Sequence, residues 1–159
     1  MKFLIVIPTL NSYKLLPRLI SSLNSQIFTN WRVIFVDGYS RNQHINFLEN
    51  ICEKDNRFQY IYQKRNSLGI YGAMNEGFRN VLPQEWLLFL GSDDYLARND
   101  VLLNINNMNK SPKDYHLFLA NAVYVNNNNL VRNSYFNFYR NLNLSLFLGS
   151  TPPHQGTLF

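Results

Sequence analysis

The 159-residue sequence predicts an α/β domain with a Rossmann-like, mainly parallel sheet flanked by helices. Three observations favour this fold. Short strand-like segments alternate with helical segments four times in the first part of the chain. Three of the strand-like segments are almost wholly apolar, which is typical of strands buried on both faces. The same three segments end in small polar or acidic residues, as strands that deliver ligand-binding groups often do.

The expected elements follow one another closely, so the chain is read as one domain over residues 1–159. We expect strands at residues 2–7, 31–36, 58–62 and 85–90, and helices from about residue 12 and at 42–54, 69–78 and 99–108. Beyond them, residues 115–125 and 130–139 are expected to pair as a C-terminal antiparallel β-hairpin around the turn Asn126–Asn129.

The helices have recognisable apolar faces. The first is expected to be capped by Asn11 or Ser12. Its apolar face consists of Leu15, Leu16, Leu19, Ile20 and Leu23. The second is expected to bury Ile45, Leu48 and Cys52. The third contains three glycines, each costing about 1 kcal/mol relative to Ala, so something is expected to approach its backbone closely.

Composition restricts the function classes. The net charge of +5 would suit an anionic ligand, but the basic residues are scattered, which disfavours nucleic-acid binding. The single cysteine, Cys52, can form no internal disulfide and is typical of a reducing compartment. No apolar run approaches the roughly 20 residues that cross a bilayer.

Asp93 and Asp94 directly follow the fourth strand-like run and the break at Gly91. Two adjacent carboxylates repel each other, and a hard divalent cation such as Mg²⁺ would neutralise them with few protein ligands. The alternative is an Asp-Asp turn in which Ser92 caps a helix.

Other polar residues follow the earlier strands. Thr9 and Asn11 follow the first, and Asp37 and Ser40 follow the second, so together they form one wall of a nucleotide site. Each also has a structural alternative, since Asp37-Gly38 is a common turn. Lys64 and Arg65 could meet phosphate or form a solvated loop, and His154 could ligate a metal or be merely exposed.

Four motifs in order resemble family 2 glycosyltransferases of the GT-A fold, in particular bacterial enzymes of surface-polysaccharide synthesis. They are Ile7–Asn11, Val36–Ser40, Gly69–Gly77 and Phe89–Asp94. The resemblance implies inverting transfer of a sugar from a nucleotide-diphosphate donor, UDP-type, to a glycan or lipid-linked acceptor in the cell envelope, with Mg²⁺ or Mn²⁺ as cofactor. Pro153–Gln155 resembles a family segment that reaches the active site from the far side.

The resemblance also implies roles for individual residues. Asp94 would bind the metal together with Asp93. Asp93 would also bind the ribose, and Asp37 would bind a uracil-type base. The implied donor-binding set is Pro8, Thr9, Asn11, Asp37, Gly38, Ser40, Lys64, Arg65, Gly69, Ala73, Asn75, Ser92 and Asp93.

Some positions depart from the family pattern. Gly72 and Ser67 stand where relatives carry Asp, and Asn42 lies near the place of another acidic residue. Family members are usually longer, with an acceptor half after the His-Gln segment. The resemblance therefore implies that part of the acceptor side is missing here.

No acidic residue stands out as the catalytic base that inverting transfer requires. The other acidic residues are assigned to the donor site, to helices or to the start of a strand. Glu76 and Asp114 then remain as candidates for the base. Poor turnover despite donor binding is therefore expected. The alternatives are a catalytically impaired nucleotide-sugar-binding remnant and a sugar nucleotidyltransferase, which would need a Gly-rich, Arg-containing loop in place of Pro8–Asn11.

The expected location is cytoplasmic, with peripheral contact at the inner face of the membrane. The apolar residues in segment 142–148 would supply an exposed patch for that contact or for a homodimer.

Overall fold

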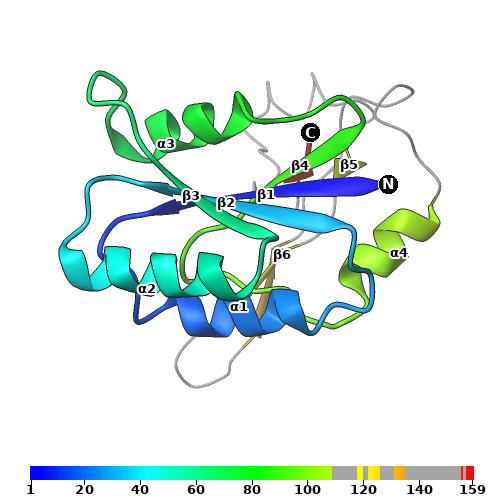
Figure 1. The fold of residues 1–159 in the computed structure, drawn as a ribbon. Coiled ribbons are helices and arrows are strands. Elements are labelled where there is room, and N and C mark those ends of the chain that lie inside the picture. Colours follow the sequence, from blue (N-terminus) through cyan, green and yellow to red (C-terminus); the bar gives the residue numbers. More distant parts are fainter. Residues whose placement is uncertain (109–117, 120–121, 126–130, 135–154, 156) are drawn as a thin grey trace.

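The computed structural model describes residues 1–108, 118–119, 122–125, 131–134, 155 and 157–159 (Figure 1). The strands in this part are β1 (Lys2–Thr9), β2 (Trp31–Asp37), β3 (Phe58–Tyr62), β4 (Glu85–Phe89), β5 (Phe118–Leu119), β6 (Ala122–Val125), β7 (Val131–Ser134) and β8 (Thr157–Leu158). The helices are α1 (Leu16–Asn24), α2 (Asn42–Lys54), α3 (Gly69–Phe78) and α4 (Val101–Asn107).

The main sheet has the strand order β3-β2-β1-β4-β8-β5. β1 to β4 are parallel to one another, and β8 is antiparallel to both β4 and β5. The predicted mainly parallel, mixed sheet is therefore confirmed. We call the edge at which β1 to β4 end the carboxyl edge, and the opposite one the amino edge.

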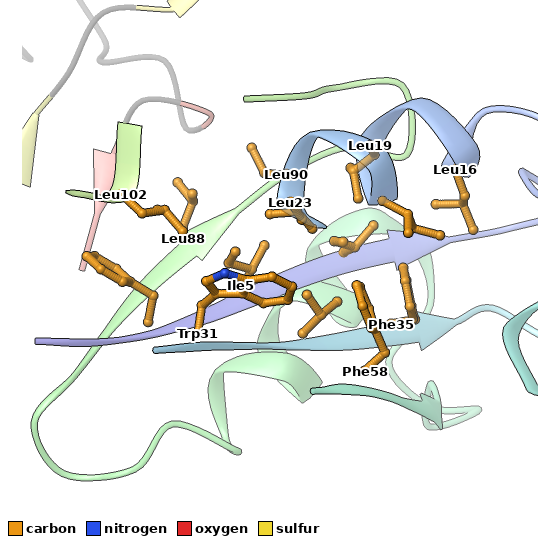
Figure 2. Packing of buried hydrophobic residues seen from close by; sticks show 14 of the residues in the cluster. Ile5, Leu16, Leu19, Leu23, Trp31, Phe35, Phe58, Leu88, Leu90 and Leu102 are labelled. Carbon is orange, nitrogen blue, oxygen red and sulfur yellow. The ribbon is translucent and has the colours of Figure 1, made fainter. Parts of the chain in front are cut away.

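Helices cover both faces of the sheet, α1 and α2 on one and α3 on the other (Figure 1). Alternate residues of each central strand enter two separate cores. Phe3, Ile5 and Ile7 pack with α1 and α2, and Figure 2 shows Ile5 in this larger core. Leu4 and Val6 pack with Ala73 of α3 in the smaller one. Burial on both faces explains why these strands are continuous apolar runs in the sequence.

Both tryptophans of the chain lie in the larger core. Trp31 and Trp86 are 3% and 1% exposed, and each stands at or next to the start of its strand. The ring of Trp31 meets Phe58 edge-on at 5.6 Å, and the Arg57 guanidinium lies over it at 3.8 Å. The tryptophans therefore mark the amino half of the core.

An ion-pair cluster ties the strands together at the amino edge. Both oxygens of Glu85 accept hydrogen bonds from Arg32, from Nε at 2.8 Å and Nη2 at 2.7 Å. The backbone N–H of Leu82 donates to Oε2 at 2.9 Å, and Lys2 Nζ lies 3.4 Å from Oε1. The Glu85 side chain is 1% exposed, so this carboxylate depends on its partners.

The helix boundaries differ from expectation in places. The start of α1 at Leu16 is not capped by a side chain, and Leu15, predicted to be buried, is exposed. The backbone carbonyl of Ser12 instead accepts from the N–H groups of Leu15 and Leu16. In α2 the fully buried residues are His44 and Leu48, whereas Ile45 and Cys52 are only half-buried.

The C-terminal hairpin is confirmed where it is described, because β6 and β7 pair antiparallel. Within the range 115–125 that was predicted as one strand, the described residues form β5 and β6. β5 pairs with β8 in the main sheet while β6 belongs to the two-stranded sheet. The predicted turn Asn126–Asn129 and the apolar segment 142–148 lie outside the described residues. None of the described helices has the length and apolar character needed to span a membrane.

Candidate active site at the carboxyl edge

The predicted site residues gather where the strand order reverses direction. After β1 the chain adds β2 and β3 on one side, then crosses to place β4 on the other side of β1. Ligands of open α/β sheets bind beyond the carboxyl ends of strands at such a switch point. Thr9 and Asp37, the last residues of β1 and β2, are register partners there.

Two serines join the loops that follow β1 and β4. Ser92 Oγ donates a hydrogen bond to the carbonyl of Pro8 at 3.0 Å, and Ser12 Oγ donates to Ser92 Oγ at 2.9 Å. Neither serine therefore acts as the helix cap that the sequence allowed. Their hydrogen bonds instead fix the Asp93-Asp94 turn beside the end of β1.

The two carboxylates of this turn converge on Gly91. The backbone N–H of Gly91 donates to Asp94 Oδ2 at 2.6 Å. A Cβ on Gly91 would stand 2.9 Å from Asp93 Oδ1 and 3.0 Å from Asp94 Oδ2. Both carboxylates therefore lie against the Gly91 backbone, and their oxygens are ligands of the kind that a hard divalent cation takes, with others coming from water and phosphate. These residues therefore fit Mg²⁺ or Mn²⁺.

We expect Gly91→Ala to weaken metal binding at this turn. The added methyl group would push both carboxylates off their present rotamers, at a cost of about 0.5–1.5 kcal/mol. Titration of the variant with Mn²⁺ and a nucleoside diphosphate should show weaker metal dependence, with nucleotide affinity in EDTA unchanged. An unaltered Mn²⁺ dependence would contradict the convergence of the two side chains.

Asp37 is fully buried and already held by neighbouring groups. Ser40 donates to it twice, from N to Oδ2 at 2.8 Å and from Oγ to Oδ1 at 2.6 Å. Thr9 Oγ1 donates to Oδ1 at 3.3 Å. In this arrangement a nucleobase would reach the Asp37 carboxylate only after Ser40 and Thr9, which are hydrogen-bonded to it, have shifted.

The loops after β1 and β2 are joined by a reciprocal pair of hydrogen bonds. Asn11 N donates to Ser40 Oγ at 2.7 Å, and Arg41 N donates to Asn11 Oδ1 at 2.9 Å. Asn11 has a left-handed φ of 52°, which Asn tolerates well. Gly38 N donates to the carbonyl of Thr9 at 2.9 Å, so four of the predicted donor-binding residues, Thr9, Asn11, Gly38 and Ser40, shape one corner.

An exposed aromatic pair stands beside this corner. The rings of Tyr39 and Tyr62 stack at 5.5 Å with 13° between their planes, and both side chains are nearly half exposed. The guanidinium of Arg65 lies 5.3 Å from the Tyr39 ring centroid. Tyr39 has a φ of 66°, which is unusual for a bulky residue and accompanies functional sites.

The loop from β3 to α3 explains one departure from the family pattern. The amide of Gln63 is buried and donates to the carbonyls of Ser67 and Gly69. This bond pattern draws the loop onto α3, and a Cβ on Gly72 would stand 2.1 Å from the Ser67 carbonyl oxygen. An Asp at position 72 is therefore incompatible with this loop. The close approach expected from the glycines of α3 is found here and at Gly77, whose Cβ would meet Val6 at 2.2 Å.

Glu76, a candidate catalytic base, is buried on α3, and two basic side chains engage its carboxylate. Arg79 Nη1 donates to Oε1 at 2.5 Å, and Lys64 Nζ lies 3.7 Å from Oε2. Lys64 of the β3–α3 loop is thus paired with α3, where Asn75 is exposed and Ala73 packs in the smaller core. The other candidates, Asp114 and His154, lie outside the described residues.

Two buried residues of this region, His44 and Gln63, were not among the predicted site residues. His44 stands four positions before Leu48, so helical spacing alone places it on the buried face of α2. Among the residues that the structure describes, no three His, Cys, Asp or Glu side chains form a group that could hold a metal. The Asp93-Asp94 pair thus offers two carboxylates, with no third ligand of these types beside them among the described residues.

Comparison with known proteins identifies the family. The fold is that of GT-A glycosyltransferases, the class that the four motifs indicated. The family model for glycosyl transferase family 2 matches residues 4–157. The chain belongs to glycosyl transferase family 2.

Two curated relatives are 34% identical to the chain. One, a PGL/p-HBAD biosynthesis glycosyltransferase of Mycobacterium bovis, aligns over 103 residues, or 65% of this chain and 40% of the relative. The other, the poly(ribitol-phosphate) beta-N-acetylglucosaminyltransferase TarS of Staphylococcus aureus, aligns over 62% of this chain and 17% of its own length. The chain thus spans less than half the length of these relatives.

Solved structures agree with the fold. S. aureus TarS residues 1–349 in complex with UDP-GlcNAc superpose with a TM-score of 0.60 and 28% identity, over 74% of this chain and 32% of that chain. A mannosyltransferase from Pyrobaculum calidifontis, in complex with GDP-Man and Mn²⁺, has a TM-score of 0.56 over 65% of this chain and 30% of its own. At 17% identity the latter shows the fold alone.

Proposed function

We propose that this chain binds a nucleotide-diphosphate sugar at the carboxyl edge and serves the donor side of an inverting, metal-dependent glycosyltransferase. The observation that carries the proposal is the convergence of Asp93 and Asp94 on Gly91 at the switch point of the sheet. There, Asp94 with Asp93 would hold Mg²⁺ or Mn²⁺. The metal, when bound, neutralises the charge of the leaving diphosphate.

A UDP-type donor is the best supported choice. The 28%-identical TarS was solved with UDP-GlcNAc and with UDP, and the present chain matches its fold. In this chain the corner of Thr9, Asn11 and Ser40 would border the nucleoside, with Asp37 behind it. Arg65 and the tyrosine pair lie on the same side and would provide a cation and aromatic surface.

The acceptor is proposed to be a glycan or a lipid-linked glycan. Support comes from the relatives' names, which place one in PGL/p-HBAD biosynthesis and the other on poly(ribitol-phosphate). Activity would then take place at the inner face of the membrane. Glu76 is a poor general base because Arg79 and Lys64 already engage its carboxylate, so Asp114 is the better candidate in this chain.

Titration with UDP, GDP and ADP in the presence of Mn²⁺ tests the proposal. We expect UDP to bind most tightly of the three nucleotides. Asp37→Asn should weaken the binding of UDP by about 1–3 kcal/mol, because Asn replaces an acceptor-only group with one that also donates. Glu53→Gln, a carboxylate-to-amide change on the exposed end of α2, is the matched control.

The pattern of loss separates two roles of Asp37. A loss confined to UDP supports recognition of the base. Equal losses for all three nucleotides would instead mean that Asp37 acts only by holding Ser40, and absence of nucleotide binding in the unmodified chain would contradict the proposed function. Affinity without sugar transfer, measured with a UDP-sugar and lipid-linked acceptors, would identify the chain as a donor-binding remnant.

A further inference from the structure

His44 of α2 is buried directly behind the nucleotide corner. Its side chain is 1% exposed, and neither ring nitrogen makes a hydrogen bond within the described part of the chain. Buried polar atoms usually have a partner, so this imidazole lacks the bonding that a purely structural residue would have. Its Nε2 lies 3.3 Å from Asp37 Oδ1.

The two oxygens of Asp37 have different surroundings. Oδ1 faces three groups, namely Ser40 Oγ at 2.6 Å, Thr9 Oγ1 at 3.3 Å and His44 Nε2 at 3.3 Å. Oδ2 accepts from Ser40 N at 2.8 Å. A carboxylate offers about four acceptor positions, so Oδ2 is the oxygen with capacity for a ligand once the groups that cover the buried Asp37 have shifted.

We infer that His44 is a positioning residue for Asp37, and that its protonation weakens nucleotide binding at the carboxyl edge. This inference rests on the proposed function. Neutral His44 leaves the full negative charge of Asp37 to attract a donor N–H of the base. A protonated imidazole would form an ion pair with Oδ1 and neutralise that charge, leaving Oδ2 a poorer acceptor.

The surroundings of His44 set the pH range of this effect. Burial lowers the pKa of His44 below its ordinary value of 6.5, and the Asp37 carboxylate partly opposes that shift. Asp37, from the end of β2, is the charged group that acts on the imidazole among the described residues, while Thr9 and Ser40 meet the same carboxylate but do not titrate. The imidazole is therefore neutral near pH 7 and gains its proton at acidic pH.

The decisive experiment measures UDP affinity with Mn²⁺ at about pH 7.5 and pH 5.5 for the unmodified chain and for His44→Gln, which keeps a polar amide but does not titrate in this range. Titration of the UDP phosphate is common to both proteins and cancels in the comparison. We expect the affinity of the unmodified chain to fall more than that of the variant, by about fivefold once His44 is protonated, the lower end of typical coupling between sites. Equal falls would overturn the inference.

A second measurement needs no variant at His44. By linkage, saturating UDP must lower the pKa of His44, followed through its imidazole NMR signals, and an unchanged pKa overturns the inference. In the ligand-free protein, Asp37→Asn should also lower that pKa because it removes the attracting charge, whereas an unchanged value shows that the two side chains are not coupled. Failure of UDP to bind at any pH would overturn the proposed function, and this ligand-free titration would still decide the coupling.

Discussion

Asp94→Ala is expected to abolish the metal dependence of nucleotide binding. The substitution removes a carboxylate oxygen of the acidic pair at Gly91, so the diphosphate charge loses its counter-ion, an interaction worth several kcal/mol. Calorimetric titration with UDP should give a much weaker affinity in Mn²⁺, equal to that measured in EDTA.

Asp55→Ala is the matched control for this prediction. Asp55 precedes β3 at the amino edge, where it pairs with Arg57, so its loss removes a carboxylate far from the proposed site. UDP affinity should keep its response to Mn²⁺ in this variant. If the unmodified chain binds UDP equally well with and without EDTA, the assignment of a metal to Asp94 is wrong.

Glu85→Gln is expected to have the largest effect on stability. The amide can no longer form an ion pair with Arg32, whose side chain is only 21% exposed, and breaking such a buried pair costs about 3–5 kcal/mol. Urea unfolding at pH 7 would measure the loss, with the exposed Glu53→Gln as control. A loss under 1 kcal/mol, as for surface pairs, would contradict the structural role of the cluster.

The pH dependence of this loss has a defined sign. Burial tends to raise the pKa of Glu85, but the hydrogen bonds from Arg32 and the Leu82 N–H outweigh it, and the pKa lies below the ordinary 4.5. The stabilisation is therefore complete above that value and disappears as the pH falls through the folded-state pKa. The difference between the two proteins should shrink accordingly as the pH falls below 4.5.

The central fold was predictable because it follows from local sequence patterns, namely apolar runs that end in polar or acidic residues. Strands such as β1 and β4 are apolar on both faces, and parallel pairing then brings Thr9, Asp37 and the Asp93-Asp94 turn to one edge. The family was likewise recognisable from four motifs, and the match over residues 4–157 confirms it. These features depend on short stretches of sequence read in order.

Features that depend on contacts between distant segments were not predictable. Serine is a common helix-capping residue and Ser12 precedes α1, yet its hydroxyl donates a hydrogen bond to Ser92, 80 positions away. The segment around β5 and β6 looked like one strand because nothing local shows that β5 pairs with β8. His44 and Gln63 are polar residues in ordinary surroundings by sequence, and only the packing of α2 and of the β3–α3 loop buries them.

The positions of the tryptophans have a practical consequence for optical measurements. Trp31 and Trp86 lie at the amino half of the larger core, whereas the Tyr39–Tyr62 stack lies at the carboxyl edge beside the proposed nucleotide corner. Tryptophan emission should therefore follow unfolding, including the response of Trp86 to changes at the adjacent Glu85, and be insensitive to UDP. Tyrosine absorbance should respond to UDP while the fold stays intact. The molecule thus carries separate chromophores for stability and for occupancy, so a single sample can report both without a label.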